Sequence, residues 1–218
     1  LSGYIHWQLS GEKVLGIDDA SGMFPIDPTT ETYNARMLEI FSGLPAAAAL
    51  HKELDDILPC VLMAGRAAGK LTSEGAALLD ESGTLMAGCP MCPPEGDAGT
   101  GMIATNSIRE RTGNISVGTS IFSMNVLERP FQKVYRDVDI VMTPNGKPTA
   151  MVHSNNCTSD INAWFGLFSE IVTVVGQPVS ADTLYQKLFQ QVEQADPGGG
   201  GLLNYSFLSG ENLTRTEK

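Results

Sequence analysis

The chain has 218 residues, of which 42% are hydrophobic and 18% are charged, so it can bury a sizeable core in one large or two modest domains. Its 14 basic and 25 acidic residues give a net charge of −11, which excludes nucleic acid as a main partner because no basic stripe can neutralise phosphates. No stretch has the length and apolar character of a membrane span or a secretory signal, so we expect no membrane partner and a cytoplasmic protein.

The first eighty residues are predicted to form packing helices and strands joined by polar turns. Asp18 and Asp19 lie in a polar stretch, residues 18–22, that is typical of a solvated turn or cap; a supporting role in a binding cleft is the alternative. Apolar spacing and capping residues predict helices over Tyr4–Leu9, Glu31–Phe41, Ala46–Leu58 and, after Thr72, as far as Leu79, with a strand over Val61–Ala64.

The four cysteines (Cys60, Cys89, Cys92 and Cys157) are too few and too unevenly spaced for a disulfide framework. Cys89 and Cys92 form a lone CxxC without the second ligand pair that a zinc site needs, so we expect no metal ligands. Buried, reduced thiols are the expected state, and a redox-active CxxC is the alternative.

The most informative stretch spans residues 93–120. Asp97 follows Gly96 and precedes apolar residues near helical spacing, which makes Asp97 a candidate N-cap at the positive end of a helix dipole. Gly99 and Gly101 would leave room for a ligand to approach the helix backbone. This composition indicates a site.

Residues 114–127 are predicted to form two strands joined by a tight passage at Gly118, Thr119 and Ser120. Free backbone N–H groups and hydroxyls at such a turn suit phosphate oxygens. The residues alone nevertheless favour a structural turn over a phosphate loop, because many hairpins carry them.

A second hairpin and two helices are predicted further along the chain. Strands over residues 138–142 and 149–152 flank an Asn-Gly turn, which is a strong hairpin signal. An amphipathic helix should begin near Ser180, and the glycines at 198–201 should form an exposed loop.

A further helix, from Ile161 to Val175, has the best-defined apolar stripe of the chain, and we expect this stripe to be core. Polar residues gather at its N-terminus, where free N–H groups suit an anion. Helix capping by Thr158 or Ser159 is an alternative at least as strong as a nucleotide contact.

Four segments together resemble the centre of the FGGY carbohydrate kinases, a family that includes xylulokinase, ribulokinase and glycerol kinase: residues 4–12, 18–22, 95–101 and 115–120. Essentially the whole chain can be laid on the middle of such a kinase, so we expect a fragment. Glu95 stands where many xylulokinases carry glycine. It is therefore a candidate substrate contact or the mark of a subfamily with a different sugar, and a solvated loop acid is the simpler interpretation.

The resemblance implies an α/β fold, the actin-like ATPase (ribonuclease H-like) two-lobe kinase fold, incomplete at both ends. Residues 1–111 would be the C-terminal part of the first, sugar-binding lobe and would end with the Asp97 helix. Residues 112–218 would be the N-terminal part of the second, nucleotide-binding lobe. Asp97 would then face the cleft between the two lobes.

The reaction implied by the resemblance is ATP-dependent phosphorylation of a sugar hydroxyl, on a pentulose or a related sugar or polyol, with Mg²⁺. Such a hydroxyl needs a carboxylate to accept its proton. Asp97 would be this general base, and Glu95 with Asp97 would contact the sugar. The Gly118–Ser120 turn and Ser159 would contact the nucleotide.

Two alternatives remain on the sequence alone. One is another actin-like ATPase, in which Asp97 positions water, and the other is a non-catalytic module that binds nucleotide or sugar. The expected partners are a small-molecule sugar and ATP, with homodimer formation left open. We expect the isolated chain to bind nucleotide weakly and to turn over little.

Overall fold

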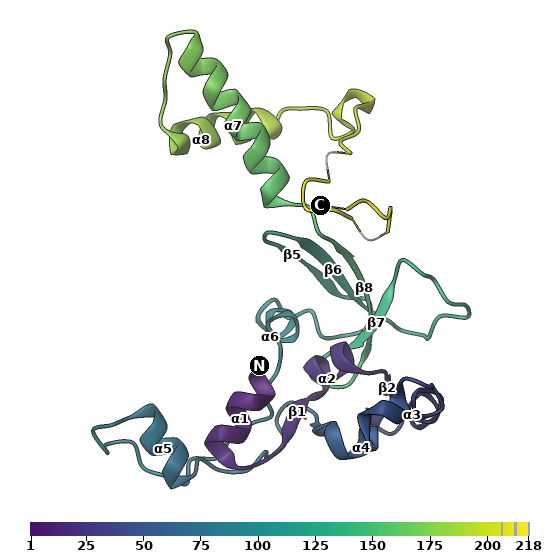
Figure 1. Cartoon of the computed structure of the whole chain (residues 1–218). Helices are drawn as coiled ribbons and strands as arrows, with labels where there is room; N and C mark the ends of the chain where they lie inside the picture. The colour runs from purple at the N-terminus through teal and green to yellow at the C-terminus, as the bar shows by residue number, and fades with distance from the viewer. Residues whose placement is uncertain (206, 212, 218) are drawn as a thin grey trace. The chain divides into compact units, whose positions relative to one another are not determined.

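The computed structural model describes residues 1–205, 207–211 and 213–217 (Figure 1). Its contacts divide the chain into two compact units. The first unit comprises residues 1–116 and 123–152, and the second comprises residues 117–122 and 153–218.

The elements follow in chain order. Up to the last strand they are α1 (Ser2–Ser10), β1 (Val14–Gly16), α2 (Ile17–Met23), β2 (Ile26–Asp27), β3 (Thr32–Tyr33), α3 (Ala35–Ser42), the 3-10 helix η1 (Ala47–Leu50), α4 (Leu54–Ile57), β4 (Cys60–Leu62), α5 (Ser73–Leu79), α6 (Asp97–Ala104), β5 (Gly113–Val117), β6 (Ile121–Val126), β7 (Asp139–Met142) and β8 (Pro148–Ser154). After β8 they are α7 (Thr158–Val174), α8 (Ala181–Val192) and the 3-10 helix η2 (Gly199–Gly201).

The strands form three sheets. β1 pairs with β4 in parallel, β2 pairs with β3 in antiparallel orientation, and four strands form the largest sheet in the order β5-β6-β8-β7. All three residues of β1 are buried, which fits a parallel strand covered on both faces.

The core of the first unit contains a buried cluster of Leu15, Ala20 and Tyr33, and further buried side chains lie on α2, α6 and β6. Ile17 on α2 and Met102 on α6 are fully buried, and Met124 on β6 is 1% exposed. Burial of side chains of this size stabilises the folded chain by about 1.5–3 kcal/mol each. The first turns of α2 and α6 are joined by the hydrogen bond from the Gly99 N–H to Asp18 Oδ2.

Two helices begin where the sequence predicts them, because a capping residue precedes each. The Thr72 hydroxyl accepts a hydrogen bond from the Gly75 N–H at 2.9 Å, so α5 begins at Ser73. Ser180 caps α8 in the same way through the Thr183 N–H at 3.2 Å.

The Asn-Gly hairpin is also confirmed. β7 and β8 pair in antiparallel register from Asp139 opposite Met151 to Met142 opposite Pro148. Gly146 in the connecting turn has φ 80°, a left-handed conformation that glycine adopts without strain.

Three predicted elements differ from the structure. The helix expected over residues 31–41 begins only at Ala35, because Thr32 and Tyr33 form β3 and Asn34 caps α3. The single helix expected over residues 46–58 is instead η1 and α4, separated by His51 in the left-handed region at φ 54°, which ends a right-handed helix. The polar turn expected at residues 18–22 is instead part of α2, with Asp18 and Asp19 in its first turn.

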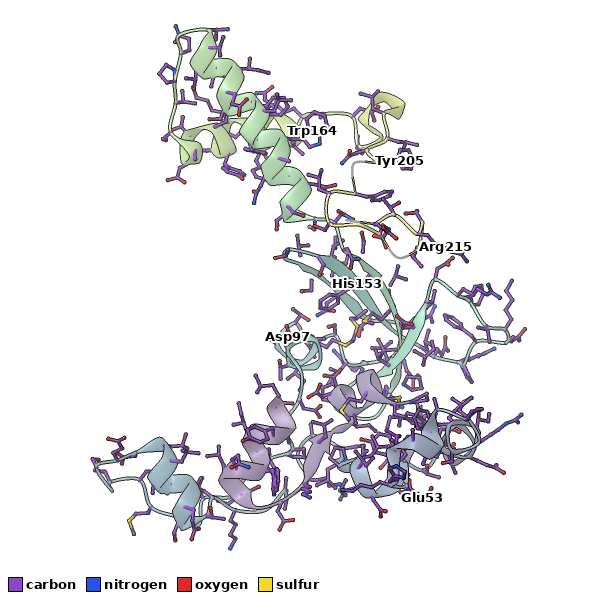
Figure 2. All side chains as sticks on the ribbon, viewed as in Figure 1. Glu53, Asp97, His153, Trp164, Tyr205 and Arg215 are labelled. Atoms are coloured by element: carbon purple, nitrogen blue, oxygen red, sulfur yellow. The ribbon has the colours of Figure 1, made fainter. Side chains whose placement is uncertain are left out.

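Helices α7 and α8 pack against each other through aromatic rings. Phe165 and Tyr185 are stacked with their centroids 3.8 Å apart, and Leu184 is buried. The prediction that the stripe of α7 is core is wrong, because none of its apolar residues is fully buried in the parts of the chain that the structure describes. Trp164 is 47% exposed (Figure 2), Ile171 is 49% exposed, and Phe168 and Val175 are exposed as well. Among the described residues, α8 covers only one side of the apolar stripe.

The cysteines are free thiols. Three of them are exposed and Cys157 is half-buried, so the expectation of buried thiols is wrong, although their reduced state agrees with it. The glycine loop at 198–201 is exposed as expected. In the described parts of the chain, no helix has both the length and the apolar character needed to cross a membrane.

Candidate functional site

Asp97 is the first residue of α6 rather than its N-cap, a place that Gly96 takes (Figure 2). The side chain is exposed, and its Oδ1 accepts a hydrogen bond from the N–H of Ala98 at 2.9 Å. Asp97 Oδ2 has no hydrogen bond within the described residues. The helix dipole favours an acid in the first turn, and the open Oδ2 of Asp97 is available to a ligand.

The two glycines of α6 have different surroundings. A Cβ at Gly99 would lie 2.3 Å from Asp18 Oδ2 and 2.8 Å from Pro144 Cγ, so this glycine allows α6 to pack closely on α2 and on the β7–β8 turn. A Cβ at Gly101 would lie 3.8 Å from the nearest heavy atom, Asn114 Nδ2. The expectation that both glycines make room for a ligand is therefore wrong for Gly99, whose space is filled by protein.

Asp18 is buried, contrary to the prediction of a solvated turn. Its Oδ2 accepts the Gly99 N–H at 3.1 Å, so an acid on α2 satisfies a free donor of α6. Burial raises the pKa of Asp18 to about 6, aided by the nearby carboxylates of Asp19 and Asp97 and opposed by the Gly99 and Gly96 N–H groups.

Glu95 is half-buried against Gly16 and is not the solvated acid of the simpler interpretation. Its Oε2 accepts the N–H of Asp18 at 3.2 Å, and its Oε1 is buried without a hydrogen-bond partner among the described residues. A Cβ at position 16 would lie 2.2 Å from the Glu95 carboxyl group. Burial, followed by the charge of Asp18, raises the pKa of Glu95 to about 8.

The first unit thus gathers three carboxyl groups at the start of α6: Asp18 from α2, Glu95 from the segment before α6, and Asp97 from α6 itself. Sequence reasoning found Asp97 and Glu95 but left Asp18 as a solvated turn. The available signal was the match of residues 18–22 to a family segment, which indicated a role in the cleft but not a contact with α6.

The turn at residues 118–120 joins β5 and β6 as predicted, and it belongs to the second unit. The Gly118 N–H donates to the Ser120 carbonyl at 2.9 Å, so it is not free as expected. Within the described residues, the hydroxyls and the backbone N–H groups of Thr119 and Ser120 make no hydrogen bonds. These four donors are available to an anion.

The N-terminus of α7 lies against this turn. The Thr158 N–H donates to the Gly118 carbonyl at 3.2 Å, and this hydrogen bond joins the two segments within the second unit. Cys157 occupies the N-cap position without a side-chain hydrogen bond, so neither Thr158 nor Ser159 caps the helix. The Ser159 hydroxyl instead lies 3.2 Å from that of Ser209.

A C-terminal loop, residues 207–211, is fastened to the same helix end. Asn156 Nδ2 donates to the Gly210 carbonyl at 2.7 Å, and Asn156 Oδ1 accepts the Ser209 N–H at 2.9 Å. Glu211 accepts hydrogen bonds from the Ser154 hydroxyl at 2.8 Å and the Asn155 N–H at 3.3 Å. Sequence reasoning missed these contacts, because they join residues more than fifty positions apart.

No group of three or more His, Cys, Asp and Glu side chains that could hold a metal ion is found in the part of the chain that the structure describes. The candidate groups of the first unit are the carboxyl groups of Asp18, Glu95 and Asp97. Those of the second unit are the hydroxyl and N–H donors of Thr119 and Ser120. The two units are each held together by their own hydrogen bonds.

Comparisons with known proteins identify the class to which these features belong. Residues 113–218 match the C-terminal domain of the FGGY family of carbohydrate kinases. No curated protein sequence matches the chain.

Solved kinases share the fold of the chain. The xylulose kinase of Rhodospirillum rubrum is similar with a TM-score of 0.66 at 20% identity, over 92% of this chain and 36% of that protein. The xylulose kinase of Bifidobacterium adolescentis gives 0.62 at 20% identity, over 98% and 42%. The gluconate kinase of Lactobacillus acidophilus gives 0.68 at 17% identity, over 99% and 38%.

Residues 113–218 match the FGGY family of carbohydrate kinases, and the mixed α/β structure of the chain is part of the actin-like ATPase fold of the solved kinases. The family and the fold class predicted from the sequence are confirmed. The chain spans 36–42% of the length of the three solved relatives. The lobe boundary at residue 111 stays a prediction.

Proposed function

We propose that the chain is part of an enzyme that transfers a phosphoryl group from ATP to a hydroxyl of a pentulose or a related sugar or polyol. The match of residues 113–218 to the FGGY family supports the reaction class. The observation that supports the assigned residue is the exposed Asp97 carboxyl group at the start of α6, with one oxygen free of hydrogen bonds among the described residues.

Asp97 would act as the general base. A sugar hydroxyl becomes a good nucleophile as its proton is removed, and a positioned carboxylate within hydrogen-bond reach contributes a rate factor of about 10²–10⁴. Glu95 would contact the sugar as well. Its Oε1 is buried without a hydrogen-bond partner among the described residues, so a sugar hydroxyl would have to enter this buried position to donate to it.

The nucleotide would bind at the second unit. Thr119 and Ser120 have free hydroxyls and N–H groups, and Ser159 lies in the first turn of the 17-residue helix α7, whose dipole favours an anion. Gly118 would contribute through its place in the turn rather than through its N–H, which Ser120 already engages. Mg²⁺ would bind together with the phosphates of ATP, as it does in phosphoryl transfer generally.

The test uses the complete kinase that contains this chain, with a panel of pentuloses, hexuloses, polyols and aldonates. Sugar phosphate and inorganic phosphate are both measured. We expect one sugar to be phosphorylated and Asp97→Asn to lower kcat by about 10²-fold or more. Asp55→Asn is the matched control, because Asp55 is also an exposed acid in the first turn of a helix, α4.

Three other results would contradict the proposal. Release of inorganic phosphate regardless of the sugar would favour an ATPase in which Asp97 positions water. Binding without turnover would favour a nucleotide- or sugar-binding module. Full activity of Asp97→Asn would remove Asp97 from the role of base.

A further inference from the structure

Asp18 reaches from α2 to both sides of Asp97. Its Oδ2 accepts the N–H of Gly99, two residues after Asp97, at 3.1 Å. The same oxygen lies 3.2 Å from the position of a Cβ on Gly96, the residue before Asp97. Asp18 is 6% exposed, so this contact is sheltered from solvent.

Asp18 is itself fixed to the larger sheet. The Ser21 hydroxyl donates to the Asp18 carbonyl at 2.6 Å, and the same hydroxyl accepts the Met142 N–H from β7 at 2.9 Å. The Asp18 N–H donates to Glu95. A continuous set of hydrogen bonds therefore runs from β7 through α2 to the first turn of α6, entirely within the first unit.

We propose that Asp18 is a positioning residue for Asp97: by capping the Gly99 N–H from a neighbouring helix, it holds the first turn of α6 where the base must lie. This inference rests on the proposed function, since it assigns Asp18 a role through Asp97. A buried acid tied to a sheet can hold a helix end more rigidly than a cap from the adjacent loop, whose backbone moves with the helix. Misplacement of a reacting group by about 1 Å can lower a rate on the order of 100-fold.

The experiment measures kcat and KM for sugar phosphorylation by the complete kinase with four variants. Asp18→Ala removes the acceptor and should lower kcat on the order of 10- to 100-fold, with a smaller change in the KM for ATP. Asp18→Asn retains an acceptor oxygen and should keep most of kcat. Asp19→Asn is the matched control, because Asp19 is the adjacent acid of α2 and its side chain bonds the Ser2 hydroxyl instead of α6.

The Asp97→Asn variant distinguishes failure of the proposed base, Asp97, from failure of the positioning role of Asp18. If Asp97→Asn is as active as the parent, the proposed function of Asp97 fails. If Asp97→Asn is inactive while Asp18→Ala has the kcat of the parent, the role of Asp18 fails. If kcat falls equally in Asp18→Asn and Asp18→Ala, the effect is due to the lost negative charge and not to the lost hydrogen-bond acceptor. This result would also overturn the proposal.

Hydrogen exchange gives a test that needs no variant to fold. In the parent chain the Gly99 N–H should exchange more slowly than the Ala98 N–H, whose acceptor is the exposed side chain of Asp97. Equal exchange at the two positions would contradict the buried hydrogen bond to Asp18 on which the proposal depends.

Discussion

Alanine at Gly99 and at Gly101 should change the stability of the chain in opposite directions. Both residues lie in α6, where alanine is favoured over glycine by up to about 1 kcal/mol. The Cβ that Gly101→Ala adds would have only Asn114 Nδ2 within 4 Å, at 3.8 Å, so this variant should gain most of this energy. It is therefore the internal control for helix propensity.

The Cβ that Gly99→Ala adds would meet fixed atoms instead. It would lie 2.3 Å and 2.4 Å from Oδ2 and Cγ of Asp18 and 2.8 Å from Pro144 Cγ. Overpacking of this kind costs about 1–3 kcal/mol, and a weakened hydrogen bond to a charged group costs about 1–2 kcal/mol more. After the gain in propensity, we expect Gly99→Ala to destabilise the chain by about 2 kcal/mol.

Urea denaturation followed by circular dichroism measures both free energies of unfolding. The two variants should differ by about 3 kcal/mol, which is well above the error of such measurements. Equal effects of the two substitutions, or a stabilising Gly99→Ala, would refute the close packing of α6 on Asp18. The pair also tests the original expectation that both glycines face a ligand.

Two further predictions concern Glu95 and Asn156. Because the pKa of Glu95 is raised to about 8, its contribution to stability is fully present below about pH 4.5 and is lost as the pH rises through 8. Glu95→Gln should therefore reduce the difference in unfolding free energy between pH 5 and pH 9 by about 2 kcal/mol, with solvent screening of the half-buried carboxyl included; an unchanged difference would contradict a neutral Glu95. Asn156→Ala should speed exchange of the Ser209 N–H about tenfold or more by removing its acceptor, whereas Asn155→Ala, which removes a side chain without a hydrogen bond among the described residues, should not; equal exchange in both variants would oppose this anchoring of the loop.

Elements with a local signal could be predicted from the sequence. Thr72 and Ser180 are N-caps whose side-chain oxygen accepts a hydrogen bond from the backbone N–H three residues later. The start of each helix therefore depends on a few neighbouring residues. The Asn145-Gly146 hairpin has the same property, because the turn conformation depends on the turn residues themselves. For such elements, packing in the rest of the chain agrees with the local preference.

The exposed stripe of α7 shows where periodicity is insufficient. Its spacing correctly gives the helix and the side on which Phe165 meets Tyr185. Spacing cannot tell how much of the stripe a partner covers, and Trp164 and Ile171 are half-exposed among the described residues. Burial depends on which elements pack against the helix, which no short window of sequence contains.

The candidate site could be predicted only in part for the same reason. A motif places Asp97 at the start of a helix, but the partner of Gly99 is 81 positions away and that of Glu95 is 77 positions away. Without those contacts, Asp18 and Glu95 have the appearance of ordinary polar loop residues. Their burial raises the pKa of both carboxyl groups.

The three acids at the start of α6 differ in how many of their carboxyl oxygens already accept hydrogen bonds or are buried. Asp18 is buried and its Oδ2 is engaged by the Gly99 N–H, so it is poorly placed to accept a proton from a substrate. Glu95 has one oxygen engaged by Asp18 and the other buried, and its raised pKa favours the neutral acid at neutral pH, which is the wrong form for a base. Asp97 is exposed and bonds only the N–H of its neighbour Ala98, through Oδ1. Of the three acids, Asp97 is therefore the one whose surroundings leave an oxygen open to a substrate, and this supports the proposal of Asp97 as the base independently of the family motif.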